Sequence, residues 1–312
     1  MSEPVSLARP RALKEGDRVA VICVSSPVES EALNAGLDAL RFAGLDPVTY
    51  PSAYDPGTMR PYLAGDDAMR AGDLRSALTE PGIAGILFAR GGSGAQRALE
   101  AMDWDGLNPE AGMPPKALAG YSDVTAVLEA VAVRLGWASV FGPNIAIKEG
   151  ASHYSFGSLL RTLMRPDQAT MIRYPQAVTV VPGLARGVTT GGTLSLLASS
   201  LATSTSRPAR GGILLLEDVN EEDYRIDRML TQLRRSGYLD GVAGIVAGAF
   251  TGCGPPEAIQ DILTERLGSL SVPMIAWANV GHGGQFQAFP YGIAAELDAG
   301  AASLRLLDAP LS

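Results

Sequence analysis

Short apolar runs alternate with amphipathic stretches along the first half of the chain. The apolar runs predict strands at residues 18–24, 47–50, 83–88, 117–119 and 138–141, and the amphipathic stretches predict helices at 29–43, 67–78, 94–102 and 124–135. Helices of this length between successive strands are typical of crossover connections, which join parallel strands. The first half is therefore predicted to be a parallel sheet with helices on both faces.

The pattern changes after Gly150. A polar, proline-containing stretch covers residues 165–175, and β-branched residues at 177–181 precede a turn at Gly183. The remaining pattern predicts strands at 213–216, 245–250, 274–277, 294–297 and 303–307 and helices at 224–235 and 256–267. We therefore predict an α/β protein with a doubly wound, flavodoxin-like parallel-sheet domain in residues 1–150, a linker or boundary region in 151–185, and a smaller mixed α/β domain in 186–312.

Length and charge narrow the functional classes. The chain has 312 residues, of which 46% are hydrophobic, so it is long enough to bury two cores. Its formal net charge is -8, and its Lys and Arg residues are scattered without forming a basic stripe. We expect no nucleic-acid partner, because binding the phosphate backbone requires a concentrated positive surface.

The N-terminal residues do not resemble a secretory signal. Residues 1–17 include Pro4, Pro10 and two arginines and have no apolar core of signal-peptide length. No uninterrupted apolar run reaches the roughly 18–20 residues that a membrane span requires. We therefore expect a cytoplasmic protein that does not cross a membrane.

Cysteine and histidine are scarce. Cys23 and Cys253 each lie in an apolar run, which favours two buried thiols over a disulfide or a nucleophile. His153 and His282 are the only histidines, so a cage of Cys and His ligands has little support. We expect no bound metal.

A serine stands at a predicted junction between a strand and a helix. In the segment 116–125 (KALAGYSDVT) a buried strand leads into Ser122 and then into a helix. A serine at such a turn projects its hydroxyl from the carboxyl edge of the sheet, and the backbone N–H of Asp123 can point at a developing oxyanion. Gly120 leaves room for the turn, although Val124 stands where a second glycine is usual. The alternative is that Ser122 or Asp123 only caps the helix.

A glycine-rich turn follows the strand at 83–88. The backbone amides of Arg90-Gly-Gly-Ser-Gly94 are expected at the same carboxyl edge, where open α/β sheets bind ligands, so Gly91 or Gly92 can supply a second oxyanion donor. A tight connection without a functional role is the alternative. The spacing fits neither the dinucleotide pattern G-x-G-x-x-G nor the Walker pattern, which argues against both nucleotide cofactors.

A serine nucleophile needs a base within hydrogen-bond reach, and the base needs an acid that holds its tautomer. His282 lies in a glycine-flanked loop (NVGHGG, 279–284) after an apolar strand, whereas His153 lies in the boundary region. Glu217 ends the apolar strand that begins at Gly212, where a carboxylate is costly without a partner. Asp218 is the alternative acid.

With these residues in chain order, the sequence resembles the LD-carboxypeptidase family, which includes the microcin C immunity peptidases. Several motifs in one order are far more specific than any single motif. They cover nearly the whole chain: Leu13–Asp17, Tyr62–Gly65, Arg70–Leu74, Arg90–Gly94, Gly120–Thr125, Gly191–Leu194, Leu216–Asp218, Tyr224–Leu230, Gly281–His282 and Pro290–Gly292.

The resemblance implies a serine peptidase whose triad forms between the two domains. Ser122 is then the nucleophile, His282 the general base and acid, and Glu217 the carboxylate that orients His282. It also implies an oxyanion hole from the backbone N–H of Asp123 and of Gly91 or Gly92. Family members cut the bond between an L-centre and the terminal D-alanine of murein tetrapeptides during peptidoglycan recycling, use no cofactor and commonly form homodimers.

Two alternatives concern the substrate. The immunity branch of the family hydrolyses the bond joining a modified aminoacyl group to a nucleotide. The stretch from Gly150 to Gly191 is short for the nucleotide-contacting loop of that branch, which favours the carboxypeptidase. Ser93 stands where members of the family usually have an aromatic residue, and Thr193 stands where they commonly have an asparagine. We expect both positions in the substrate region. From a different class, a ligand-binding α/β protein would keep the cleft without the chemistry.

Overall fold

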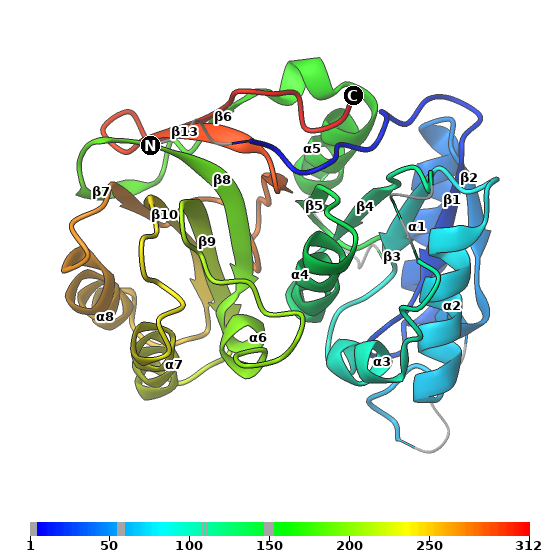
Figure 1. The fold of residues 1–312 in the computed structure, drawn as a ribbon, viewed down its shortest axis with the longest axis horizontal. Coiled ribbons are helices and arrows are strands. Elements are labelled where there is room, and N and C mark those ends of the chain that lie inside the picture. Colours follow the sequence, from blue (N-terminus) through cyan, green and yellow to red (C-terminus); the bar gives the residue numbers. More distant parts are fainter. Residues whose placement is uncertain (1–4, 55–59, 108, 110–111, 147–152) are drawn as a thin grey trace.

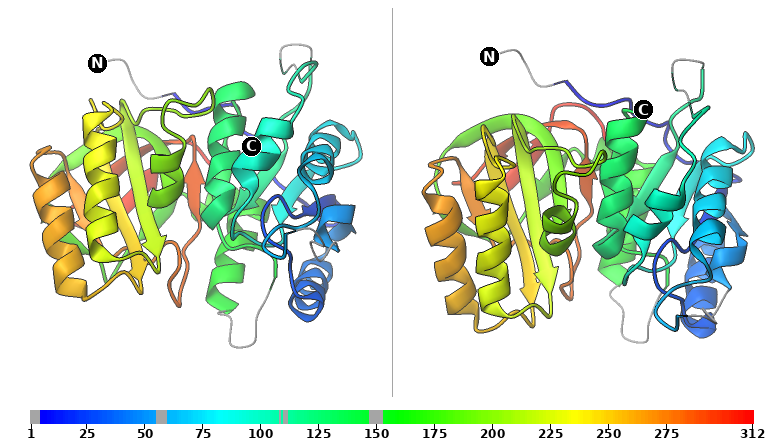
Figure 2. Two further views of the ribbon diagram at one scale, coloured as in Figure 1. Left: turned by 90° about the horizontal axis from the view of Figure 1, so that it is seen from below. Right: turned by 60° about the horizontal axis from the view of Figure 1, so that its bottom comes forward.

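Two β-sheets, each covered by helices, build the computed structural model, which describes residues 5–54, 60–107, 109, 112–146 and 153–312 (Figures 1 and 2). The domain boundary expected at Gly150 lies outside these residues. The prediction of an α/β fold with a parallel first sheet and a mixed second sheet is confirmed.

The first sheet is 6-stranded, in the order β12-β5-β4-β3-β1-β2. Strands β1 to β5 are parallel, and β12 joins the edge of β5 antiparallel. The order β2-β1-β3-β4-β5 is that of flavodoxin-like sheets. The strands are β1 (Arg18–Ile22), β2 (Asp46–Thr49), β3 (Gly85–Phe88), β4 (Ala117–Gly120), β5 (Ser139–Phe141) and β12 (Phe289–Tyr291).

Helices cover both faces of the first sheet, as Figure 2 shows. Leu74 and Val127, from α2 and α4, belong to the core on one face, and Leu37 and Leu159, from α1 and α5, to the core on the other. Strand β3 is buried on both faces and is accordingly apolar throughout. The helices are α1 (Ser30–Phe42), α2 (Asp67–Thr79), α3 (Ala95–Ala101), α4 (Thr125–Arg134) and α5 (His153–Met164), with short 3₁₀ turns η1 (Pro51–Ala53), η3 (Ser122–Val124) and η4 (Pro166–Ala169).

The second sheet is 8-stranded, in the order β6-β14-β13-β8-β9-β10-β11-β7. Strands β8 to β11 are parallel, and the remaining pairs are antiparallel. The strands are β6 (Met171–Arg173), β7 (Val178–Val181), β8 (Leu184–Thr193), β9 (Gly212–Val219), β10 (Gly244–Thr251), β11 (Met274–Ala276), β13 (Ala294–Asp298) and β14 (Ser303–Leu306). One face is covered by α6 (Leu194–Ser199), α7 (Asp223–Arg235) and α8 (Pro256–Gly268).

Segments expected to separate the domains instead belong to the two sheets. Residues 151–185, expected as a linker or boundary, contain α5, which packs on the first sheet, and β6 and β7, which lie at the two ends of the second sheet. Strand β12 comes from the C-terminal half of the chain but completes the edge of the first sheet. The two sheets are therefore interleaved in sequence.

Both cysteines are free and buried, as predicted. Burial raises the pKa of the Cys23 thiol to about 12, so this group stays protonated at neutral pH. Among the described residues, no cluster of His, Cys, Asp and Glu could hold a metal ion. No helix in this part of the chain has the length and apolar character needed to cross a membrane.

Glu129 of α4 is a carboxyl group buried between the two sheets. The hydroxyl of Tyr238 donates a hydrogen bond of 3.4 Å to Glu129 Oε1. The other carboxyl oxygen, Oε2, has no hydrogen-bond partner in the described part of the chain. Burial raises the pKa of Glu129 to about 8, from an ordinary value of 4.5. Between these values the folded protein binds a proton that the unfolded chain releases, so this group lowers stability as the pH rises through the window.

Replacing Glu129 with glutamine is expected to stabilise the protein more at pH 9 than at pH 5. Glutamine resembles the protonated acid, and it removes a cost on the order of a few kcal/mol that the folded state carries above the pKa. Urea unfolding at the two pH values measures the difference, with the exposed Glu265→Gln as control. Equal stabilisation at both values would contradict the assignment.

Candidate active site

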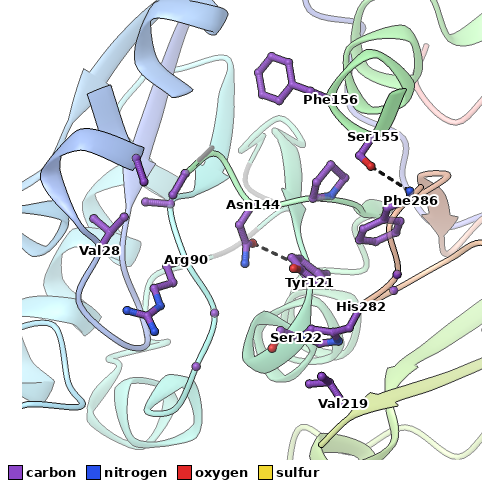
Figure 3. A pocket seen from close by; sticks show the side chains of 18 of the residues that line it. Val28, Arg90, Tyr121, Ser122, Asn144, Ser155, Phe156, Val219, His282 and Phe286 are labelled. Atoms are coloured by element: carbon purple, nitrogen blue, oxygen red, sulfur yellow. Dashed lines mark hydrogen bonds between the residues drawn. The ribbon is translucent and has the colours of Figure 1, made fainter. Parts of the chain in front are cut away.

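A cavity of about 1160 Å³ opens beside the carboxyl ends of the first sheet's parallel strands (Figure 3). The loops after β1, β3, β4 and β5 form one side, and the ends of β9 and the loop 281–286 form the other. This is the edge at which open α/β sheets bind ligands. The residues that argue for chemistry here are Arg90, Gly91, Gly92, Ser122, Asn144 and His282.

Ser122 stands in a strained turn directly after β4. Its φ is 65°, a left-handed backbone conformation that costs a non-glycine residue about 1–2 kcal/mol and occurs often at active sites. A Cβ at Gly120 would lie 2.8 Å from Val124 Cγ1, so the turn requires this glycine. The side chain of Ser122 does not cap a helix; it lines the cavity.

The side chain of Asp123 joins two parts of the site. Its Oδ2 accepts a hydrogen bond of 2.7 Å from the backbone N–H of Ala95, the first residue of α3, instead of capping the helix that follows it. Burial raises the pKa of this carboxyl. The backbone N–H of Asp123 belongs to the turn of Ser122, so this bond fixes the serine turn relative to the glycine-rich turn.

The glycine-rich turn lies against Ser122. A Cβ at Gly91 would lie 3.0 Å from Ser122 Oγ, whereas one at Gly92 would collide with Ser26. The buried Arg70 holds the far end of this turn, because its Nη1 donates to the carbonyl oxygens of Val24 at 2.9 Å and Gly94 at 3.0 Å. Of the two glycines named as oxyanion donors, Gly91 therefore has its α-carbon beside the serine hydroxyl.

Glu217, in the second sheet, is hydrogen-bonded to His282, in the loop between β11 and β12. Glu217 lies within β9, which extends to Val219, and is fully buried. Its Oε2 lies 2.7 Å from His282 Nδ1 and accepts the His282 backbone N–H at 3.0 Å. A carboxylate acceptor places the imidazole proton on Nδ1 and leaves Nε2 as the acceptor. A Cβ at Gly281 would lie 2.2 Å from Glu217 Oε2, so only glycine fits at this position.

Asp218, the alternative acid, has other partners. Its Oδ2 accepts the backbone N–H of Ser195 at 2.8 Å, and its Oδ1 accepts that of Val219 at 2.8 Å. Burial raises the pKa of Asp218 to about 6. This carboxyl group therefore fixes the start of α6, and among the described residues its hydrogen-bond partners do not include His282.

An aromatic cluster that the sequence analysis missed supports the histidine. The ring of Tyr121 lies 4.7 Å from that of His282 and 5.0 Å from that of Phe286, measured between centroids. Burial raises the pKa of Tyr121 to about 12, so the phenol stays neutral. Asn144 Oδ1 accepts the Tyr121 backbone N–H at 3.2 Å (Figure 3). Tyr121 directly precedes the candidate nucleophile in the sequence, and this adjacency could have predicted that it belongs to the site.

The structure brings some of the predicted residues together and separates others. Ser122 and His282 line the same cavity, with the backbone of Gly91 and Gly92 on its wall. Within the described part of the chain, no hydrogen bond joins Ser122 to His282. His153, at the start of α5, is exposed and lines the cavity as well. Ser93 and Thr193 are not among the residues that line it, and their place in the substrate region stays a prediction.

Two family models match this chain, the LD-carboxypeptidase N-terminal domain over residues 19–142 and the LD-carboxypeptidase C-terminal domain over 186–297. A putative carboxypeptidase of Streptomyces coelicolor is 46% identical, with 96% of each chain covered. This chain belongs to the LD-carboxypeptidase family. A murein tetrapeptide carboxypeptidase of Pseudomonas aeruginosa is 32% identical, with 90% of this chain and 93% of the relative covered.

Two solved structures share the fold of this chain. A muramoyltetrapeptide carboxypeptidase from Oxalobacter formigenes is 25% identical with a TM-score of 0.76, covering 93% of this chain and 97% of that one. An MccF-like protein from Bacillus anthracis is 24% identical with a TM-score of 0.83, covering 96% and 98%. The second likeness shows the shared fold alone.

Gly91→Ala is expected to lower the kcat of this LD-carboxypeptidase family member by about ten-fold or more, because it would displace Ser122, the candidate nucleophile, and small displacements of a reacting group are costly. The new Cβ would lie 2.7 Å from Ser122 Cβ, closer than side chains pack. Gly72→Ala in α2 is the control, because a Cβ there meets nothing within 4 Å. Steady-state kinetics of the two variants test the prediction. Equal kcat values would contradict the contact.

Proposed function

We propose that this protein is a serine LD-carboxypeptidase that removes the terminal D-alanine from murein tetrapeptides. The observation that carries the proposal is the hydrogen bond of 2.7 Å between buried Glu217 and His282, because His282 lines the same cavity as Ser122. Ser122 as nucleophile, His282 as base and Glu217 as the acid that orients the base would form a catalytic triad. In the sequence they occur in the order Ser, Glu, His.

In the proposed reaction, Ser122 Oγ attacks the scissile carbonyl while His282 Nε2 takes its proton. The backbone N–H groups of Asp123 and of Gly91 or Gly92 stabilise the oxyanion. His282 then donates the proton to the departing amine of D-alanine, which leaves an acyl-enzyme on Ser122. Water, activated by the same imidazole, releases the shortened peptide. Buried Glu217 stabilises the imidazolium in both steps.

The substrate assignment follows from the relatives and is supported by the cavity. The named relatives include a murein tetrapeptide carboxypeptidase and a muramoyltetrapeptide carboxypeptidase. A carboxypeptidase must bind a terminal carboxylate. Arg90 is the one Arg or Lys among the described lining residues, and its Nη1 is fixed by the carbonyl oxygen of Pro27 at 2.5 Å. We assign this guanidinium to the carboxylate of D-alanine, since the pair is charge-assisted.

The deciding experiment combines substrate turnover with labelling of the serine. Purified protein is incubated with murein tetrapeptide, and D-alanine release is followed by mass spectrometry. A parallel sample is treated with a fluorophosphonate, and the labelled residue is located by peptide mapping, because only an activated serine reacts. Release together with a label on Ser122 is the expected result. Absence of label on Ser122, beside a serine hydrolase that labels, would overturn the triad.

The same experiment separates the second substrate class. If Ser122 is labelled but no D-alanine appears, the triad stands and an aminoacyl-nucleotide conjugate becomes the substrate to test. The homodimer and the cytoplasmic location stay predictions, which light scattering of the purified protein and cell fractionation test.

A further inference from the structure

Thr193 is buried at the end of β8, outside the cavity lining, and touches the candidate acid. Its hydroxyl donates a hydrogen bond of 2.5 Å to Glu217 Oε1, the oxygen that His282 does not use. Thr193 is 3% exposed, so water does not replace this donor. With Thr193 on Oε1 and His282 on Oε2, both carboxylate oxygens of Glu217 are satisfied without a countercharge other than the imidazole.

The backbone of Thr193 is attached to the helix that carries the candidate nucleophile. Its N–H donates to Thr125 Oγ1 at 3.2 Å, and Thr125 is the first residue of α4, three positions after Ser122. A Cβ at the preceding Gly192 would lie 2.7 Å from Thr125 Cγ2, so β8 and α4 approach too closely for any side chain there. Thr193 thus connects the first sheet's helix to the second sheet's acid.

We propose that Thr193 is a positioning residue, which holds the Glu217–His282 pair in register with Ser122 through its two hydrogen bonds. The inference rests on the triad of the proposed function. It assigns to Thr193 a role in the charge and orientation of the acid instead of in substrate binding.

Loss of the hydroxyl has a specific consequence. Glu217 Oε1 would stay buried without a donor, and the carboxylate would depend more strongly on His282 for neutralisation. The protonated imidazole is then favoured over the neutral form that acts as base. The loss should therefore lower kcat and move the acidic limb of the kcat/KM profile to higher pH, while KM changes little because Thr193 does not line the cavity.

The test compares Thr193→Val, Thr193→Ser and Thr190→Val. Valine matches threonine in shape but lacks the hydroxyl, and serine keeps it. Thr190 lies in the same strand, is also buried, and donates to the hydroxyl of Tyr291, so it controls for a lost buried hydroxyl elsewhere. Two readouts are used as a function of pH: the rate constant of fluorophosphonate labelling, which needs no assumed substrate, and D-alanine release.

We expect Thr193→Val to react about ten-fold more slowly or worse, with its acidic limb at higher pH, and Thr193→Ser to restore most of the rate. Thr190→Val should keep the wild-type profile. Should Thr193→Val fail to fold, Thr125→Val removes the acceptor of the Thr193 N–H and should slow the reaction as well. A Thr193→Val enzyme with wild-type rate and pH profile overturns the inference, as do equal losses at 190 and 193. A wild-type enzyme that does not label overturns the triad itself, a separate result.

Discussion

Replacing Ser122 with alanine is expected to lower kcat for D-alanine release by at least about a thousand-fold, and to abolish fluorophosphonate labelling. Loss of a triad nucleophile leaves only the rate supplied by binding and the oxyanion donors. The activity is measured by mass spectrometry on murein tetrapeptide, with Ser93→Ala as control, since Ser93 is exposed and lies outside the cavity lining. D-alanine release by the Ser122→Ala variant at the wild-type rate would contradict the proposed mechanism.

Ser122→Gly adds a second readout of the same turn. Glycine also lacks the hydroxyl, but it adopts a φ of 65° without the penalty of a Cβ. We expect this variant to be inactive and yet as stable as the alanine variant or up to about 1 kcal/mol more stable, despite the entropy cost of glycine. A clear loss of stability relative to alanine would show that the turn is not strained.

Replacing Glu217 with glutamine is expected to lower kcat by about a hundred- to ten-thousand-fold. Both carboxylate oxygens accept hydrogen bonds, from Thr193 and from His282, so the amide NH₂ must face a group that now donates. If it faces His282, the imidazole takes the wrong tautomer. If it faces Thr193, the hydroxyl reverses its bond and the imidazolium still loses its countercharge.

Asp218→Asn is the matched control for this prediction. Asp218 neighbours Glu217 and is equally buried, but it accepts backbone N–H groups, which an amide oxygen can also accept. We expect a loss of less than about ten-fold in kcat, since only one of its two acceptor oxygens disappears. Rates and thermal unfolding are measured for both variants. A greater loss at 218 than at 217 would mean that the acid has been assigned to the wrong residue.

Apolar periodicity predicted most strands and helices because buried parallel strands carry continuous apolar side chains. It missed β8 (Leu184–Thr193), whose end is rich in glycine and threonine. Those threonines are buried through hydrogen bonds, as when Thr189 donates to the carbonyl oxygen of Ile293. It also missed β12, which has only three residues and pairs with a strand about 150 positions away.

For the site, residue type and position relative to strands made Ser122, Glu217 and His282 candidates. The family resemblance then selected them, and their roles stay a prediction. The partners of these residues could not be predicted, because they come from packing between the two sheets. Thr193 contacts Glu217 across two neighbouring strands, and Tyr121 meets His282 across the cavity wall. Neither contact leaves a periodic signal in the sequence.

The return of β12 to the first sheet limits how this chain can be divided into fragments. His282 is followed within a few residues by β12, which belongs to the sheet that carries Ser122, and it is preceded by β11 of the other sheet. The two segments matched by the family models therefore do not coincide with the two sheets, and we expect neither segment to fold as a separate module. A fragment that ends before 289 would leave the edge of β5 unpaired, and an exposed strand edge of that kind invites association with other chains.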